Sequence, residues 1–113
     1  MKCGQIILLE YPFTDGSGCK VRPALIVSSD VFNSREDFVA VPISAQEFPN
    51  DMNIFPLDAG ADWFKQTGLR AQSKTIRWSI LMTISQQVVK STLGVMPSEQ
   101  LQTVRSMIQR MFQ

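Results

Sequence analysis

The chain has 113 residues, of which 44% are hydrophobic and 19% are charged, so its size and composition fit one globular domain spanning residues 1–113. It contains no histidine, which excludes histidine-based acid–base catalysis, histidine triads and the usual zinc enzymes. The net charge is only +1, but residues 1–62 hold four basic and nine acidic side chains, whereas residues 63–113 hold seven basic and one acidic. Such an asymmetry is typical of a surface that binds a polyanion, and equally of a solvated surface with self-complementary halves.

The N-terminal segment lacks the long apolar core and small-residue cleavage site of a signal peptide, and no apolar run approaches the ~20 residues that span a bilayer. We therefore expect a cytoplasmic protein without membrane association. Cys3 and Cys19 form neither a CxxC motif nor a zinc signature, and a disulfide is not expected in a reducing compartment. The sequence thus predicts no metal site and no cofactor.

Short β-prone segments separated by polar stretches occur along the first 96 residues. We predict a loop at residues 12–20, one helical turn within 30–37, and strands at 6–11, 21–29, 38–44, 52–57, 68–77, 83–84 and 92–96. Pro23 is compatible with a strand because it lies near the start of its segment. Pro42 indicates an edge strand or an irregular strand end.

The periodicity changes after Pro97, where apolar residues recur at spacings of three, four and seven and so form one stripe on a helix. Ser98 is the predicted N-cap of this helix. The stripe packs on the core or binds a partner, and it comprises Leu101, Val104, Met107, Ile108, Met111 and Phe112. Many short strands followed by one amphipathic helix predict a mainly β fold, a small β-barrel with the C-terminal α-helix packed on it.

Three polar segments are candidates for chemistry: residues 11–18 leading into 21–23, residues 41–46, and residues 67–78. Taken separately, each has a structural explanation. Arg22 before a proline is typical of a surface or salt-bridged arginine, and Ser44 at a strand end is typical of a turn serine. Lys74 fits a solvated strand position, and Arg77 beside Trp78 fits a guanidinium packed on a ring.

Together and in this order, the segments resemble the MazF/PemK/Kid family of type II toxins. The resemblance covers nearly the whole chain and consists of a glycine before an aliphatic strand, a PFTDGS loop, an RPALIVS strand, a PISAQ segment, a TGL element, a QSKTI strand and the terminal helix. It implies an SH3-like β-barrel of the CcdB/MazF type, and a homodimer. It also implies an endoribonuclease that cuts single-stranded RNA at short motifs without a metal and is blocked by a cognate antitoxin protein.

In this family the 2′-hydroxyl attacks the neighbouring phosphorus, which leaves a cyclic phosphate and a 5′-hydroxyl end. The reaction needs a base, an acid and a cation that stabilises the growing phosphoryl charge. The family's catalytic arginine falls on Arg22, whose planar fork can bind two phosphate oxygens. Its hydroxyl residue, commonly threonine, falls on Ser44, so the resemblance implies that Arg22 and Ser44 are catalytic.

RNA contacts are expected from the same three segments. Cationic side chains would line a groove for the phosphate backbone, and aromatic rings, Phe13 and Trp63 among them, would offer stacking faces for unpaired bases or else pack in the core. The predicted RNA-binding residues are Thr14, Asp15, Ser17, Lys20, Gln46, Arg70, Gln72, Lys74, Arg77 and Trp78.

The chain departs from the family pattern in the third segment. Many members carry an aspartate at the position of Ala71, where it is proposed as a base in Kid-like toxins, and Kid-like toxins carry an arginine at the position of Leu69. The alternative is a catalytically weak or inactive member that binds a protein, either an antitoxin or a gyrase-type target as for CcdB. Loss of RNA cleavage in Arg22→Ala with an intact fold distinguishes the nuclease from this alternative.

Overall fold

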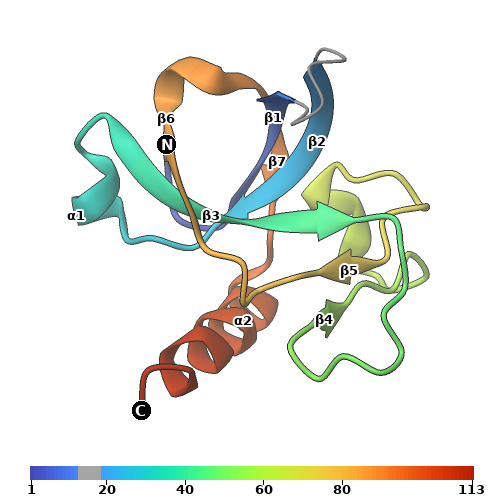
Figure 1. The fold of residues 1–113 in the computed structure, drawn as a ribbon. Helices are drawn as coiled ribbons and strands as arrows, with labels where there is room; N and C mark the ends of the chain where they lie inside the picture. Colours follow the sequence, from blue (N-terminus) through green and yellow to red (C-terminus); the bar gives the residue numbers. More distant parts are fainter. Residues whose placement is uncertain (13–18) are drawn as a thin grey trace.

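The computed structural model describes residues 1–12 and 19–113, which form short strands followed by a C-terminal helix (Figure 1). The elements in chain order are β1 (Gln5–Pro12), β2 (Cys19–Ile26), α1 (Asp30–Asn33), β3 (Asp37–Ser44), β4 (Phe55–Pro56), the 3-10 helix η1 (Phe64–Thr67), β5 (Thr75–Ile76), β6 (Met82–Ser85), the 3-10 helix η2 (Gln86–Val88), β7 (Val89–Val95) and α2 (Ser98–Arg110). Within these described residues, every helix is too short or too polar to cross a membrane.

The strands form one seven-stranded sheet with the order β4-β5-β3-β2-β1-β7, and β6 also pairs with β3. Neighbouring strands run antiparallel throughout the described ladders. β3 crosses the middle of the molecule, the sheet is bent rather than flat, and α2 lies below it in the view of Figure 1. The predicted fold class, mainly β with a C-terminal α-helix, is therefore confirmed.

Pro42 lies inside β3, at the point where this strand changes its neighbour. Residues 37–40 pair with β6, whereas the last two residues of β3 pair with β5. In the gap between the two pairings, the carbonyl oxygen of Pro42 accepts a hydrogen bond from the amide of Arg77 (3.0 Å). Of the two predicted alternatives, an edge strand is wrong, because Pro42 also pairs with Ala24 of β2. The irregular strand agrees with the gap at residues 41–42 between the pairings with β6 and β5. A proline is tolerated here because the strand is irregular on the side that its ring faces.

The strands predicted at residues 52–57 and 68–77 are mostly irregular, since only β4 and β5 pair within them. η1, which was not predicted, ends at Gly68, whose φ of 68° reverses the chain. A turn follows, in which the amide of Ser73 donates to the carbonyl of Arg70 (3.0 Å). These turns replace the strand that the alternating polarity of the third segment indicated.

Both faces of the central strands are buried, because successive residues of β1, β2 and β3 point to opposite sides of the sheet. One face belongs to a cluster that includes Ile6, Leu25, Val41, Ile43, Ile76, Trp78, Met96 and Val104. The opposite face carries a second cluster of Ile7, Leu9, Ala24, Ile26, Phe38 and Ala40. The sheet therefore has apolar packing on both sides, with α2 covering the first cluster.

α2 packs on the first cluster through the predicted stripe, of which the contacting members are Leu101, Val104, Met107 and Ile108. The last two members, Met111 and Phe112, are 42% and 72% exposed because they follow the end of the helix. The prediction that Ser98 caps the helix is wrong by one residue. The helix begins at Ser98 itself, and the carbonyl of Pro97 accepts the first helical hydrogen bond from Leu101 (2.9 Å).

Candidate functional site

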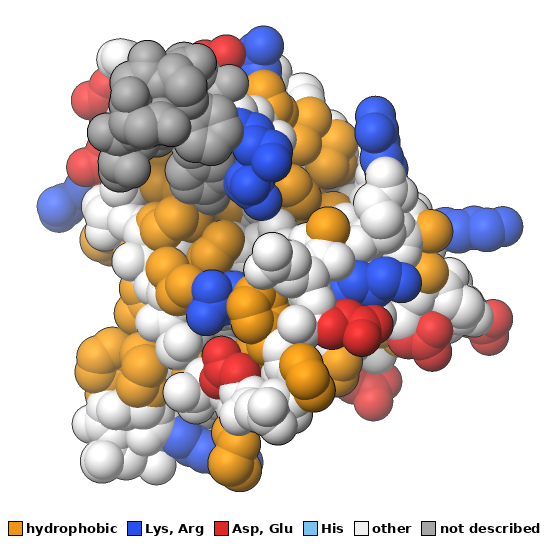
Figure 2. Space-filling model, turned by 45° about the vertical axis from the view of Figure 1, so that its right-hand side comes forward, with side chains coloured by type: hydrophobic (Ala, Val, Ile, Leu, Met, Phe, Trp, Pro, Cys, Tyr) orange, Lys and Arg blue, Asp and Glu red, His pale blue; other side chains and the backbone are white. Residues whose placement is uncertain are grey.

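A cleft of about 520 Å³ opens between the start of β2 and the segment that follows η1. Apolar side chains from three strands line part of it: Leu8 of β1, Ile43 of β3 and Leu93 of β7. The predicted site residues in its lining are Lys20, Arg22, Arg70 and Gln72. Figure 2 shows this side of the molecule, where Lys and Arg side chains are interspersed with hydrophobic ones near the grey atoms. The structure thus brings together cations from the first and third predicted segments.

The cleft carries positive charge that its own lining does not neutralise. Lys20, Arg22 and Arg70 are all exposed, and no carboxylate of residues 1–12 or 19–113 is among the lining side chains. The ion pairs found in the described part of the chain involve other side chains. Like charges gathered in a concave, partly apolar surface raise the local concentration of polyanions.

Arg22 is held at the cleft by the pairing of β2. It lies opposite Leu9 of β1, and the residue after it, Pro23, lies opposite Leu8. A residue that precedes proline is confined to extended backbone conformations, which keeps Arg22 in the strand. β2 pairs with β3 only along residues 24–26, so the stretch that carries Arg22 has no partner on its other edge within the described sheet. The cleft opens along that edge.

The other wall of the cleft depends on two glycines. A Cβ on Gly68 would lie 2.1 Å from the carbonyl oxygen of Leu93, and a Cβ on Gly94 would lie 2.3 Å from the carbonyl oxygen of Gln66. η1 and the turn after it therefore rest directly on β7, with no room for a side chain between them. This close approach brings Arg70 to the cleft. It also explains why the TGL element has a glycine at position 68, where a side chain would not fit.

Ser44 lies at the rim of the cleft, since its neighbours Ile43 and Ala45 line the cleft and Ser44 itself does not. Its Oγ accepts a hydrogen bond from the amide of Gln46 (3.0 Å). The hydroxyl of Thr75 in turn donates to the carbonyl of Gln46 (2.7 Å). The chain after β3 is thus turned sharply and tied to β5, and Gln46 is exposed there.

Three predicted contacts from the third segment lie outside the cleft lining. Lys74 is exposed. The guanidinium of Arg77 faces the loop after β3 instead, with its Cζ 4.3 Å from the ring centre of Phe48 and an ion pair to Asp51 (3.7 Å). Trp78 is 7% exposed and belongs to the core, and its Nε1 has no hydrogen-bond partner among the described residues. The RNA contact at Trp78 stays a prediction, and the burial of this residue favours a role in core packing.

Three further predicted contacts, Thr14, Asp15 and Ser17, lie outside the described residues, as does Phe13. Trp63 is half-buried and packs against the first core cluster. Other lining residues were not predicted as contacts. Pro23, Ile43, Ala45 and Ser73 lie within the three candidate segments, whereas Leu8 and Leu93 lie outside them. Most of these are small or apolar residues in or beside strands, and nothing in their local pattern separates them from core positions.

Cys3 lies apart from the cleft. Its Sγ donates a hydrogen bond to the carbonyl of Val27 (3.6 Å). Burial raises the pKa of this thiol, and the positive charge of Arg105 opposes the rise in pKa. The raised pKa keeps Cys3 a neutral thiol at pH 7, which is unsuited to nucleophilic attack. Within the described residues, no three or more Asp, Glu, Cys or His side chains are grouped so that they could hold a metal ion.

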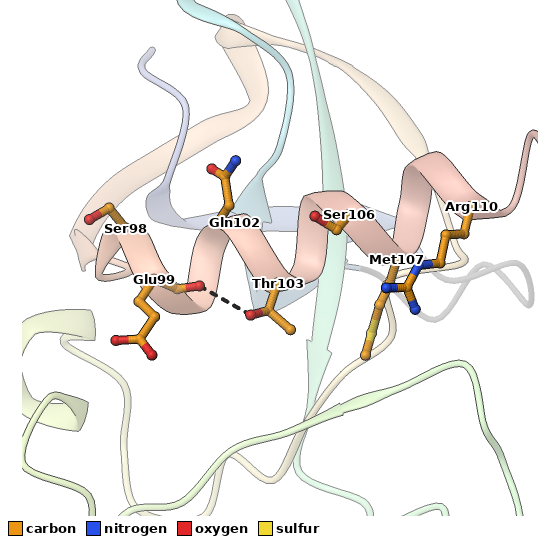
Figure 3. A pocket seen from close by; sticks show the side chains of 7 residues that line it. All are labelled: Ser98, Glu99, Gln102, Thr103, Ser106, Met107 and Arg110. Atoms are coloured by element: carbon orange, nitrogen blue, oxygen red, sulfur yellow. Dashed lines mark hydrogen bonds between the residues drawn. The ribbon is translucent and has the colours of Figure 1, made fainter.

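A second hollow, of about 630 Å³, runs along the outer side of α2 (Figure 3). Its lining side chains all come from this single helix: Ser98, Glu99, Gln102, Thr103, Ser106, Met107 and Arg110. The one hydrogen bond drawn there is internal to the helix, from the hydroxyl of Thr103 to the carbonyl of Glu99 (3.1 Å). None of the predicted catalytic or RNA-binding residues that the structure describes lines this hollow, so the cleft beside β2 is the better candidate site.

The model of the family described as PemK-like, MazF-like toxin of type II toxin-antitoxin system matches residues 2–112. The chain belongs to this family. Its members are known as endoribonucleases of toxin–antitoxin systems. No match was found among curated proteins.

Solved structures of PemK/MazF toxins share this fold. MazE-MazF from Deinococcus radiodurans superposes with a TM-score of 0.78 at 18% identity, covering 99% of this chain and 95% of that one. An endoribonuclease in complex with its cognate antitoxin from a mycobacterial species gives a TM-score of 0.74 at 16% identity, covering 99% and 94%. The Mycobacterium tuberculosis toxin MazF-mt6 gives 0.71 at 19% identity, covering 96% and 95%. At these identities the likeness establishes the fold.

Proposed function

We propose that this chain, as a single domain spanning residues 1–113, is the toxin of a toxin–antitoxin pair and cleaves single-stranded RNA in the cleft beside β2. The main support is the gathering of Lys20, Arg22 and Arg70 around a partly apolar lining, with no carboxylate from the described residues. Cations of this kind bind phosphates, and apolar surface accepts the faces of unpaired bases. Family membership agrees with this reading.

In the proposed reaction the 2′-hydroxyl loses its proton as its oxygen attacks the adjacent phosphorus, and the bond from phosphorus to the 5′-oxygen breaks as that oxygen gains a proton, so the reaction is proton-neutral overall. One product then ends in a cyclic phosphate and the other in a 5′-hydroxyl. Negative charge grows on the phosphoryl oxygens in the transition state, and Arg22 stabilises it with two parallel guanidinium hydrogen bonds. The proposed reaction therefore needs no metal ion.

Ser44 is the second proposed catalytic residue. Its Oγ already accepts a hydrogen bond from the amide of Gln46, which leaves the hydroxyl proton free to be donated. We propose that it donates to the scissile phosphate from the rim of the cleft. A neutral serine is a poor base, so its contribution is binding and charge stabilisation rather than proton abstraction.

The remaining proposed RNA contacts divide by chemistry. The amide side chains of Gln46 and Gln72 suit the edges of unpaired bases, which are accessible only in single strands. Exposed Lys74 extends the set of phosphate-binding cations beyond the cleft. Contacts from Thr14, Asp15 and Ser17 are proposed from the family resemblance alone.

A catalytically weak or inactive, protein-binding member of the family is the second candidate. One observation favours it: no described carboxylate lines the cleft, and Ala71 stands where many relatives carry an aspartate. This candidate retains the antitoxin partner or a gyrase-type target but produces no RNA fragments. An RNA cleavage assay therefore separates the two candidates.

We further propose a cytoplasmic homodimer whose cleft is covered by an acidic segment of a cognate antitoxin. The unneutralised cations of the cleft support an acidic partner, and two of the similar structures are described as complexes with an antitoxin or with MazE. β7 is an outer strand of the sheet, and the exposed apolar side chains of Val95 and Phe112 are available for a protein interface. A stable monomer in sedimentation at micromolar concentration would refute the dimer.

The test of the proposed activity uses a long single-stranded RNA in EDTA with the wild type, Arg22→Ala and a matched control, Arg35→Ala. Arg35 is exposed and lies outside the cleft, so the control removes the same charge elsewhere. We expect the wild type and the control to cut at short motifs. Arg22→Ala should cut at least ~100-fold more slowly than the wild type. Absence of cuts from folded wild-type protein would favour the inactive candidate.

A further inference from the structure

The loop between β3 and β4, residues 45–54, leaves and rejoins the sheet at one place. Ser44, just before the loop, pairs with Thr75 of β5, and Pro56, just after the loop, pairs with the same Thr75. The two ends of the loop therefore lie close together at β5, as in compact Ω-type loops. Its residue Ala45 lines the cleft.

Arg77, just after β5, holds the middle of this loop. Its guanidinium lies over the ring of Phe48, with Cζ 4.3 Å from the ring centre, and forms an ion pair with Oδ2 of Asp51 at 3.7 Å. The other carboxylate oxygen of Asp51 accepts from the amide of Asn53 (2.8 Å), and the amide of Asp51 donates to the carbonyl of Phe48 (3.1 Å). Both groups that Arg77 contacts are thus fixed to each other by the loop's own turn.

The backbone of Arg77 is also fixed, because its amide donates to the carbonyl of Pro42 in β3 (3.0 Å). Arg77 therefore connects β3, through its backbone, to the middle of the loop, through its side chain. The other ties of the loop lie near its start, where the hydroxyl of Thr75 binds the carbonyl of Gln46 (2.7 Å) and the amide of Lys74 binds the carbonyl of Ser44 (2.9 Å).

We propose that Arg77 is a positioning residue for the RNA cleft, which rests on the proposed function: it clamps loop 45–54 so that Ser44 and Ala45 keep their place at the rim. It does not bind RNA. Its charge faces Asp51, it lies outside the cleft lining, and exposed Glu47 in the same loop adds a second negative charge nearby in the chain. A phosphate would have to displace the Asp51 carboxylate to reach it.

The two roles predict opposite effects of Asp51→Asn. This change removes the charge that Arg77 faces, while an asparagine oxygen can still accept from the amide of Asn53 and keep the turn. If Arg77 clamps the loop, Asp51→Asn weakens cleavage; if Arg77 binds phosphate, freeing it tightens RNA binding. Asp58→Asn is the matched control, because Asp58 accepts in the same way from the amide of Gly60 (2.9 Å), and no ion pair is found for it in the described structure.

We expect Arg77→Ala and Asp51→Asn each to lower kcat by roughly tenfold, with a loss of ~100-fold as the limit for a displacement near 1 Å. KM should change far less. The kcat of the double variant, which carries both Arg77→Ala and Asp51→Asn, should be no lower than that of Arg77→Ala, because both changes break the same contact. Arg77→Lys, which retains the charge but not the planar stacking on Phe48, should recover part of the loss. Asp58→Asn should match the wild type.

A salt titration of RNA binding separates the clamp from a phosphate contact. The slope of log K against log salt should be unchanged in Arg77→Ala, whereas loss of one phosphate contact would reduce it by about 0.7. A reduced slope, or tighter binding by Asp51→Asn, would overturn the proposal. So would a kcat for Arg77→Ala equal to that of the wild type.

Amide hydrogen exchange of residues 45–54 tests the clamp without using activity. Exchange should be about fivefold faster or more in Arg77→Ala and Asp51→Asn, and unchanged in Asp58→Asn. Faster exchange in a protein that cuts no RNA would support the clamp and refute only the proposed function. Exchange at the wild-type rate in both variants would overturn the clamp, whatever the protein does to RNA.

Discussion

The charge of the cleft makes a quantitative prediction about the salt dependence of RNA binding. Three cations line the described cleft: Lys20, Arg22 and Arg70. Each phosphate that a protein neutralises on a single strand contributes a slope of about −0.7 in log K against log salt, so these three contacts and the proposed contact at Lys74 predict about −2.8. Raising salt fourfold should then weaken binding roughly 50-fold.

The decisive change is Arg70→Gln, because Arg70 is exposed in the cleft and is outside the proposed catalytic pair. With one contact fewer, the slope should fall to about −2.1, and the same salt increase should weaken binding only about 18-fold. Arg35→Gln carries the same charge change outside the cleft and should keep the wild-type slope. The assay is fluorescence anisotropy with a short RNA that carries 2′-O-methyl groups, which block the attacking oxygen.

An unchanged slope in Arg70→Gln would show that the cleft does not receive the phosphate backbone. An equal reduction in Arg35→Gln would mean that net charge, rather than the arrangement of the cleft, determines binding. Either result would refute the reasoning that connects the cleft to RNA.

Two further predictions concern the wall of the cleft and the half-buried thiol of Cys3. Gly94→Ala should lower the free energy of unfolding in denaturant by about 1–3 kcal/mol, because its Cβ would meet a backbone oxygen at 2.3 Å. Gly60→Ala, whose Cβ would meet only a side-chain oxygen at 3.3 Å, should cost less, and equal costs would contradict the close-approach argument. Because burial raises the pKa of Cys3, its alkylation in a Cys19→Ser variant should begin at higher pH in the folded than in the unfolded protein. The stabilisation from the neutral thiol should be present below the unfolded pKa and be lost as pH rises through the folded pKa, and identical alkylation profiles would contradict this.

The elements with a strong apolar pattern could be predicted from the sequence alone. The strands that carry Ile6, Leu25 and Val41 form the core, and the helical stripe around Val104 packs where its spacing predicted. The strand predicted over most of the third segment is wrong, because alternating polarity is typical of a strand but here belongs to consecutive turns. Gly68, which has a positive φ, and the turn at Ser73 interrupt the strand despite this alternation. The spacing of apolar residues along the sequence does not reveal the backbone angles of single residues.

The site was less predictable than the fold for a definite physical reason. Placing Arg22 and Arg70 at one site required the family resemblance, since they are far apart in sequence and meet only because η1 rests on β7. Arg77 and Trp78 were predicted as RNA contacts from residue type alone. The partner of Arg77 is a loop whose folding back no local pattern reveals, and Trp78 is buried although its chemistry suits stacking.

The proposed cleavage in the Arg22 cleft depends on attack by the 2′-hydroxyl of the bound RNA. Its most direct test is a pair of short RNAs containing a mapped cleavage motif, identical except for a single 2′-hydrogen at the nucleotide that precedes the scissile phosphate. In EDTA, the all-RNA strand should be cut to cyclic-phosphate and 5′-hydroxyl ends, while the 2′-deoxy strand should bind equally well and remain intact. Cleavage of the 2′-deoxy strand, or an intact all-RNA strand with folded wild-type protein, would contradict the account.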